Sequence, residues 1–207
     1  MKLEEFFHNN RSIIDKWPHY FEIYERHFSP FIGKKVKVME IGVWRGGSLK
    51  MWKDYFGENA EIIGIDINPN CKVFEEDRIR IYIGDQSNVN FLQDVIKQEG
   101  EFDIIIDDGG HFMHQQIISF KELYWSIKNG GVYLCEDLHT NYWKNYGGGY
   151  KNPNTFIEYT KNLIDELNAF FSQEEALKVT EFTRNTTGIH IYDSVVVFDK
   201  QHREKPG

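Results

Sequence analysis

The residues best suited to chemistry in this sequence are four carboxylates and a histidine that follow two apolar runs. They are Asp107, Asp108 and His111 after the run at residues 104–106, and Glu136 and Asp137 after the run at residues 132–135. Carboxylate oxygens suit a hard cation such as Mg²⁺. A histidine, with an unperturbed pKa of about 6.5, suits proton removal near neutrality. The pattern indicates a metal site beside a general base, with His111 as that base.

An ordinary structural role is the alternative for each of these groups, because acidic pairs often cap helices and a loop histidine often makes a single hydrogen bond. Consecutive strand residues point to opposite faces, so both members of a pair can reach one ion only where the strand has ended. Gly109 and Gly110 allow such a turn after Asp108. The occurrence of acidic pairs at two strand ends favours a functional role.

A second group of residues matches a site for a nucleoside-type cofactor. A strand predicted at 36–42 ends in a glycine-bearing loop and precedes a helix expected at 48–55. Glycines let the backbone approach a ligand closely, and helix N-terminal amides attract anions. Asp66 ends the next predicted strand, from where a carboxylate can grip ribose hydroxyls. The loop departs from the G-x-G-x-x-G pattern of dinucleotide sites. A tight strand-to-helix turn without a ligand is the alternative.

Two further loops carry weaker signals. Asp85 and Gln86 follow the third predicted strand and could hydrogen-bond an adenine ring, although such residues are equally ordinary in loops. The loop at 140–150 holds four aromatic residues and three consecutive glycines. It is expected either to form a mobile substrate lid or to cover the sheet edge.

Apolar runs and helical periodicity alternate along the chain and predict the fold that positions these groups. Strands are expected at 61–66, 79–83, 102–107 and 132–135, and helices at 90–98, 115–127 and 155–171. This alternation predicts an α/β fold: a Rossmann-like, doubly wound, mostly parallel sheet with helices on both faces. Two apolar runs around Asp193 and Ser194 predict a C-terminal antiparallel hairpin.

The chain is expected to divide into an N-terminal helical segment (1–34), a main domain (35–200) and a polar tail (201–207). Aromatic residues three or four positions apart predict an amphipathic helix in the first segment, interrupted or restarted at Pro18. We expect this helix to act as a lid or a dimer contact.

Length and composition exclude several classes of protein. With 207 residues, 41% of them hydrophobic, the chain can bury one substantial core. A net charge of −8 argues against a general nucleic-acid binder. The sequence has two cysteines, which predicts a protein without disulfides. It shows no signal peptide and no membrane-spanning run, so we expect a cytoplasmic protein.

Taken together, the motifs resemble those of the class I S-adenosylmethionine-dependent methyltransferases. More narrowly, they are similar to the metal-dependent sugar O-methyltransferases of macrolide biosynthesis. The elements that carry the resemblance are residues 40–49, Asp66, 84–87, Asp-Asp-Gly-Gly-His at 107–111 and Glu-Asp-Leu-His-Thr at 136–140. The resemblance implies an O-methyltransferase that uses S-adenosylmethionine and Mg²⁺ and modifies a hydroxyl of a sugar or glycosylated small molecule.

The resemblance also assigns roles to individual residues. The implied metal ligands are Asp108, Glu136 and Asp137, with His111 as the base that takes a proton from the acceptor. The implied cofactor-binding residues are Glu40, Gly42, Gly46, Ser48, Asp66, Asp85, Gln86 and Asp107, the last as a supporting group.

We expect only the short helical segment ahead of the main domain, without the large N-terminal domain of the macrolide enzymes, so their acceptor is not carried over. The expected partners are a small-molecule or glycan acceptor and a second copy of the chain, with no nucleic acid and no membrane. Two alternatives keep the fold. One is a nucleotide-dependent oxidoreductase, and the other is a catalytically silent cofactor-binding partner of another enzyme.

Overall fold

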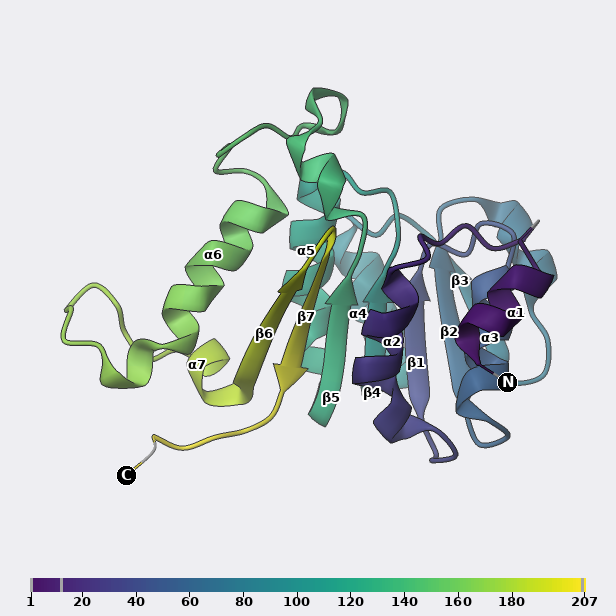
Figure 1. Cartoon of the computed structure of the whole chain (residues 1–207), viewed down its shortest axis with the longest axis horizontal. Helices are drawn as coiled ribbons and strands as arrows, with labels where there is room; N and C mark the ends of the chain where they lie inside the picture. Colours follow the sequence, from purple (N-terminus) through teal and green to yellow (C-terminus); the bar gives the residue numbers. More distant parts are fainter. Residues whose placement is uncertain (1, 12, 206) are drawn as a thin grey trace.

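The computed structural model, which describes residues 2–11, 13–205 and 207, contains a seven-stranded sheet with helices on both faces (Figure 1). Residues 1 and 12 of the predicted N-terminal segment and residue 206 of the predicted tail lie outside the described part. The strands are β1 (Lys37–Ile41), β2 (Glu61–Asp66), β3 (Ile79–Ile83), β4 (Phe102–Asp107), β5 (Ile127–Cys135), β6 (Thr186–Tyr192) and β7 (Val195–Lys200).

The strand order is β3-β2-β1-β4-β5-β7-β6. The pairs among β1 to β5 are all parallel, and β7 is antiparallel to both of its neighbours. The order reverses between β1 and β4, which is where ligands of such sheets bind, beyond the carboxyl ends of the strands. The predicted α/β class and the C-terminal hairpin are therefore confirmed.

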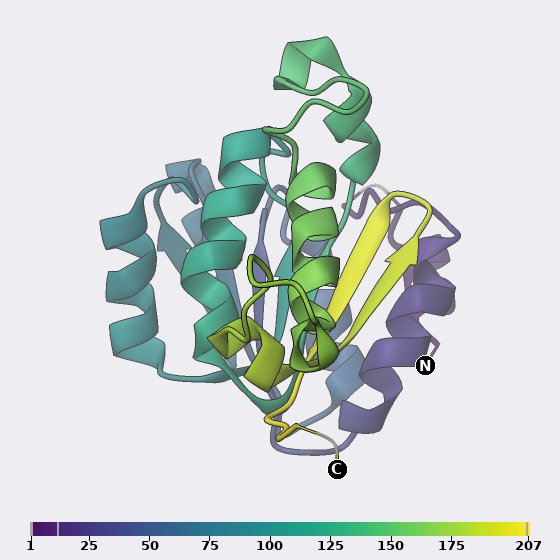
Figure 2. The same ribbon diagram turned by 90° about the vertical axis from the view of Figure 1, so that its left-hand side faces the viewer.

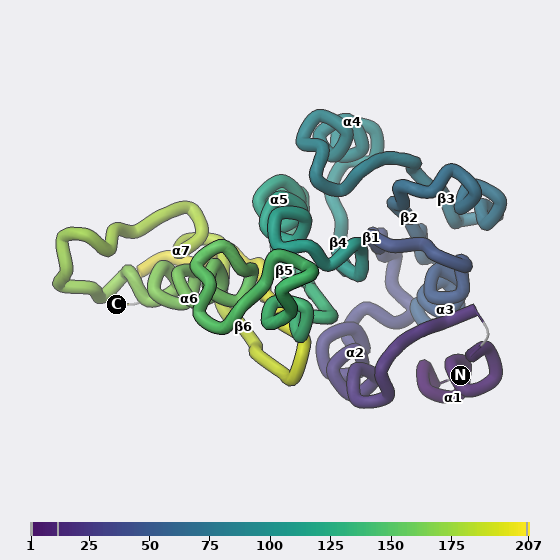
Figure 3. Tube along the Cα trace, turned by 90° about the horizontal axis from the view of Figure 1, so that it is seen from above, coloured from purple at the N-terminus to yellow at the C-terminus, as the bar shows by residue number. Residues whose placement is uncertain are grey.

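Each face of the sheet has its own hydrophobic core. One face is covered by α1 (Leu3–Asn9), α2 (Tyr20–Phe28) and α3 (Gly47–Phe56), and the other by α4 (Val89–Glu99), α5 (Met113–Leu123) and α6 (Phe156–Leu167), as Figures 2 and 3 show. Neighbouring strand residues divide between the cores, as Val38 and Met39 do. A strand buried on both faces is a continuous run of apolar residues in the sequence. The sequence pattern can therefore predict these strands. No described helix has the length and apolarity needed to cross a membrane.

The aromatic spacing of the N-terminal segment forms α2, which begins at Tyr20 just after the predicted interruption at Pro18. Tyr20, Tyr24 and Phe28 are fully buried on its inner side. Tyr24 stacks on Phe28 with ring centroids 5.7 Å apart and meets Trp52 of α3 edge to face at 5.1 Å. This packing holds the N-terminal segment firmly against the sheet.

Several predicted boundaries were wrong. The helix expected at 155–171 ends at Leu167 and is followed by a separate short helical turn at Ala169–Phe171, and the strand expected at 132–135 begins earlier, at Ile127. The helix expected at 115–127 ends at Leu123, and a short turn at Tyr124–Ser126 leads into β5, which begins at Ile127. The apolar period of three and four residues continues through Ile127, so the pattern alone could not place the end of the helix. Ile127 instead pairs with Phe102 of β4, a tertiary contact that overrides the local period.

Glu99, the last residue of α4, joins that helix to two strands. Its carboxylate accepts hydrogen bonds from Arg80 at 2.7 and 2.8 Å and from the Tyr82 hydroxyl at 2.7 Å, and Lys37 approaches to 3.3 Å. Burial acts to raise the pKa of Glu99, but the hydrogen bonds from Arg80 and Tyr82 outweigh it and hold the pKa at about 2.

A carboxylate whose pKa is lowered by folding stabilises the protein above its unfolded pKa and loses that effect as the pH falls toward its folded pKa. We therefore expect Glu99→Gln to lower the free energy of unfolding by about 1 to 2 kcal/mol at pH 7, with allowance for the partial exposure of Arg80. The difference from the wild type should shrink between about pH 5 and pH 2. Urea denaturation across this range measures it, with the exposed Glu101→Gln as control. A pH-independent difference would contradict this account.

Candidate active site

A cavity of about 430 Å³ lies beyond the carboxyl ends of the parallel strands. Its walls come from the loops that follow each of the five parallel strands and from the N-terminal segment before α2. The side chains of the predicted site that line it are Ser48, Asp66, Asp85, Gln86, Asp108, His111, Glu136 and Asp137, together with the backbone of Gly42. Residues from six separate segments therefore meet in one hollow at the point where the strand order reverses.

The loop after β1 passes very close to the loop after β4. A side chain at Gly42, whose φ is +96°, would place its Cβ 2.0 Å from the carbonyl oxygen of Asp108. The Asp66 carboxylate accepts hydrogen bonds from the backbone of Val43 at 2.9 Å and Trp44 at 3.0 Å, both through Oδ2. Its Oδ1 accepts from Asn68 at 2.8 Å and has a second lone pair for a ligand hydroxyl.

Gln86 ties the third loop to the fourth. Its side-chain oxygen accepts a hydrogen bond from the backbone of Gly110 at 2.7 Å, while its amide nitrogen donates to Asp107 and Ser119 at 3.0 Å. Asp85 caps its own loop, accepting from the backbone and hydroxyl of Ser87 at 2.8 Å. The loop of residues 84–87 thereby positions the glycines that precede His111.

Three of the predicted cofactor-binding residues, Glu40, Gly46 and Asp107, do not line the cavity. Asp107 is buried beneath it, where burial raises the pKa of this carboxyl to about 7, and its oxygens accept from Gln86 and Tyr133. Glu40 is also buried and accepts from Ser48 at 2.6 Å and Trp52 at 3.0 Å. Gly46 precedes α3 and packs against Phe74. These three residues support the cavity walls in the structure, and their contact with a cofactor stays a prediction.

Lys16 is the site residue that sequence reasoning missed. Its ammonium group donates to Asp108 at 2.6 Å, to Glu136, and to Glu40 at 3.3 Å, and its side chain is only 2% exposed. Burial alone would lower the pKa of Lys16, but the carboxylates of Asp108 and Glu136 raise it well above its ordinary value. No local pattern marks this lysine, because its partners lie 24, 92 and 120 residues away in sequence.

Helix α2 completes the same cluster with two buried tyrosines. The hydroxyl of Tyr24 donates to Glu136, and that of Tyr20 donates to Asp137 at 2.8 Å. Both oxygens of Glu136 are thus occupied, one by Lys16 and the other by Tyr24. The N-terminal segment supplies the hydrogen-bond donors that the acidic strand ends need.

Asp108 and Asp137 also form a group with His111 at the cavity surface. Their ligand atoms all lie within 4.8 Å of one another, and His111 Nε2 is 3.4 Å from Asp137 and 3.8 Å from Asp108. His111 and Asp137 both have φ values near +60°, a conformation that non-glycine residues rarely adopt. Burial lowers the pKa of His111, against the opposing influence of the carboxylates, and so favours the neutral imidazole. Such a group can accept a proton or contribute to a cation site.

An aromatic surface lies beside the cavity. Trp17, which lines the cavity, stacks on His139 with ring centroids 4.5 Å apart, and His139 meets Trp143 edge to face at 4.7 Å. A second cavity of about 420 Å³ adjoins His139 and Tyr142. Exposed aromatic rings of this kind provide flat faces on which a sugar ring or another ring can pack.

Comparisons with known proteins place these features in context. No protein-family model matches the chain. It is 35% identical over 195 residues to mycinamicin VI 2''-O-methyltransferase of Micromonospora griseorubida, a match that covers 89% of this chain and 48% of the relative. It is also 35% identical over 204 residues to 8-demethyl-8-(2-methoxy-alpha-L-rhamnosyl)-tetracenomycin-C 3'-O-methyltransferase of Streptomyces olivaceus, covering 92% of this chain and 52% of the relative.

A solved structure agrees with these matches. The MycE methyltransferase of the mycinamycin biosynthetic pathway, in complex with Mg, SAH and mycinamycin VI, superposes with a TM-score of 0.89 at 32% identity. The superposition covers 98% of this chain and 54% of that chain. This chain therefore spans about half the length of the relatives it matches.

The buried ammonium group of Lys16 generates a prediction about stability. Lys16→Met should leave neighbouring buried carboxylates without their cation and lower the free energy of unfolding by about 3 kcal/mol at pH 7 in EDTA. Urea denaturation measures this, with Lys35→Met, an exposed lysine in the turn before β1, as the matched control. Equal stability of the two variants would show that the carboxylates do not depend on Lys16.

Proposed function

We propose that this chain, which has the class I methyltransferase fold and is related to the macrolide sugar O-methyltransferases, transfers a methyl group from S-adenosylmethionine to a sugar hydroxyl. The acceptor class that the relatives suggest is a glycosylated natural product. The observation that carries the proposal is the single cavity in which the glycine loop and Asp66 face Asp108, His111 and Asp137. A methyl donor bound on one wall would meet an acceptor held on the other.

The proposed methyl donor lies along the loops that follow β1, β2 and β3. Gly42 lines the cavity and lets the loop after β1 pass close to the loop after β4, and Asp66 Oδ1 can accept a ribose hydroxyl. Gln86 and Asp85 line the cavity next to them, where an adenine ring would lie. Most of the hydrogen bonds of these side chains hold the loops in place, so the pocket exists before the ligand arrives.

The side of the cavity that carries Asp108 and Asp137 offers carboxylate oxygens, which suit a hard divalent cation. Asp108 and Asp137 face each other beside His111, and the cluster already holds one cation, the Lys16 ammonium group. We propose that Asp108 and Asp137 hold Mg²⁺, and that Glu136 joins them when its contacts to Lys16 or Tyr24 open. When bound, Mg²⁺ would orient the acceptor hydroxyl and lower its pKa.

His111 is the proposed base for the acceptor hydroxyl. Its neutral imidazole can accept the hydroxyl proton at Nε2, the atom that faces Asp137. The acceptor oxygen then forms a bond to the methyl carbon while the bond from that carbon to sulfur breaks, which leaves S-adenosylhomocysteine. Asp137, 3.4 Å from Nε2, offsets the positive charge that His111 gains. Positioning of two substrates accounts for most of the rate in such a scheme.

The aromatic surface of Trp17, His139 and Trp143 is the proposed support for the acceptor. Trp17 lines the main cavity and His139 lines the second cavity, which provides room for the rest of a glycosylated molecule. The macrolide itself is not part of the proposal, because about half of each relative has no counterpart in this chain.

If His111 is the base, replacing it should slow turnover without weakening cofactor binding. The wild type should bind S-adenosylhomocysteine in calorimetry, and His111→Gln should bind it equally well while turning over about 10²- to 10⁴-fold more slowly. Turnover is followed by mass spectrometry with a panel of natural products that carry deoxysugars. His114→Gln, an exposed histidine three residues further on, is the control. Absence of cofactor binding by the wild type would refute the proposed function, whereas normal turnover by His111→Gln would refute only the base.

The metal assignment is tested separately from catalysis. Asp108→Asn and Asp137→Asn should each weaken Mg²⁺ binding at least about tenfold in calorimetry with S-adenosylhomocysteine present, since each removes one charged ligand. The exposed Asp94→Asn of α4 should bind Mg²⁺ as the wild type does. Unchanged Mg²⁺ affinity in the Asp108 and Asp137 variants would remove the metal from the proposal and leave the methyl transfer intact.

A further inference from the structure

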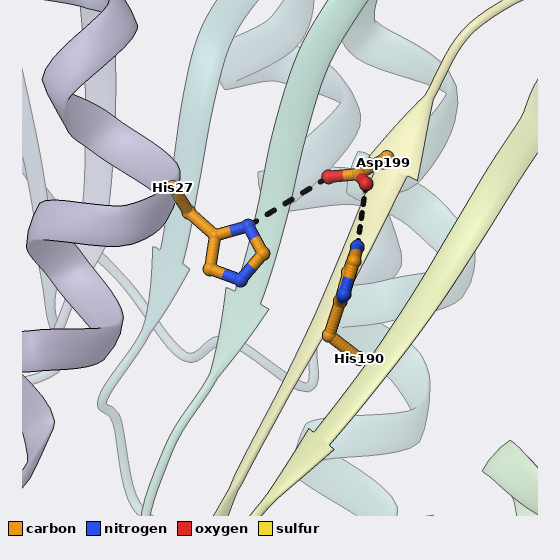
Figure 4. Close-up of side chains that lie close together, drawn as sticks. All are labelled: His27, His190 and Asp199. Atoms are coloured by element: carbon orange, nitrogen blue, oxygen red, sulfur yellow. Dashed lines mark hydrogen bonds and ion pairs between the residues drawn. The ribbon is translucent and has the colours of Figure 1, made fainter.

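Two histidines and a carboxylate converge on the face of the sheet covered by α2, away from the cavity (Figure 4). His27 lies on α2, His190 on β6 and Asp199 on β7, and their ligand atoms all lie within 4.8 Å of one another. The proposed methyl transfer makes no use of this group. Helix α2 is far in sequence from the β6–β7 hairpin, so tertiary structure brings His27 to the other two residues.

The three groups lie close to the spacing that one metal ion requires. His190 Nε2 is 2.6 Å from Asp199 Oδ2, and His27 Nδ1 is 3.8 Å from Asp199 Oδ1. Two ligands on a tetrahedral Zn²⁺ with bonds of about 2.0–2.1 Å lie about 3.3–3.4 Å apart. Small side-chain rotations therefore bring all three donors to bonding distance. The two imidazole rings, with centroids 4.7 Å apart and planes at 63°, lie side by side without blocking each other.

The second nitrogen of His27 already has a partner that fixes the ring. His27 Nε2 lies 2.9 Å from the hydroxyl of Tyr192, which in turn accepts from Arg26 at 3.4 Å. When Nε2 carries the hydrogen, the lone pair of Nδ1 points toward Asp199 across a gap too long for a hydrogen bond. Metal-binding histidines are typically held in this way by a partner at the other nitrogen. Burial lowers the pKa of His27, and the neighbouring His190 lowers it further, so the imidazole is neutral at neutral pH.

We propose that His27, His190 and Asp199 bind a Zn²⁺ ion, with water as the fourth ligand. Two imidazoles and one carboxylate suit zinc, whereas the oxygen-rich cluster at Asp108 suits Mg²⁺. Binding replaces the hydrogen bond between His190 and Asp199 with a bond from each group to the ion, and the hydrogen of the neutral His190 ring then lies on Nδ1. The ion links α2 to the β6–β7 hairpin. Because α2 also carries Tyr20 and Tyr24 and follows Lys16, zinc at this site holds in place the helix that contacts the acidic cluster.

The test is zinc binding by the full chain after metal removal with EDTA. Calorimetric titration should show one Zn²⁺ per chain at this site, and zinc should raise the Tm of the wild type. His190→Gln should weaken Zn²⁺ binding at least about tenfold and lose the Tm shift. This side chain is 39% exposed, so its replacement should leave the fold intact. His202→Gln, an exposed histidine of the C-terminal tail, is the matched control.

Cobalt provides a second readout that does not depend on stability. Co²⁺ at a tetrahedral site of two histidines and one carboxylate should give an intense visible absorption that is absent from His190→Gln and from His27→Gln. Asp108→Asn should keep both the zinc affinity and the cobalt spectrum. Loss of zinc binding in Asp108→Asn, or equal affinity in the wild type and His190→Gln, would assign the ion to the cavity and overturn the proposal. Neither outcome depends on whether the chain is a methyltransferase.

Discussion

The burial of the Lys16 ammonium group among carboxylates is the interaction on which the rest of the site depends. Three strands, β1, β4 and β5, bring Glu40, Asp108 and Glu136 to the same edge of the sheet, where their mutual repulsion must be offset. Buried charges remain ionised only when they are paired and hydrogen-bonded. Lys16 provides one cation for all three groups, and Tyr20 and Tyr24 provide hydrogen bonds to the two acids after β5.

This requirement joins the N-terminal segment to the site. Helix α2 packs its aromatic side into the core on one face of the sheet and at the same time supplies the donors above the acidic cluster. Packing and electrostatics therefore favour the same position of the helix, as expected for a sequence in which local and global preferences agree. Trp17, between Lys16 and α2, extends the segment to the cavity mouth through its stack on His139.

Three of the six described non-glycine residues with positive φ lie at the same edge. Trp44, His111 and Asp137 all have positive φ, a conformation that costs on the order of 1–3 kcal/mol in a non-glycine residue. Hydrogen bonds hold each of these loops in place: Asp66 accepts from Trp44, Gln86 accepts from the residue before His111, and Tyr20 donates to Asp137. Rigid loops of this kind present side chains in fixed positions, which a site that must align two substrates requires.

The sequence by itself determined the α/β fold, the placement of both acidic pairs at strand ends and the glycine loop followed by Asp66. These features are local: a buried parallel strand is a continuous apolar run, and the residues at its end follow directly in the chain. Only the tertiary structure decided that Asp108 faces the cavity while Asp107 turns inward to Gln86, and that Lys16 joins the cluster. The same holds for the approach of His27 to His190 and Asp199 of the β6–β7 hairpin. The physical reason is that contacts between distant residues depend on how helices pack across the sheet, and no local period encodes that packing.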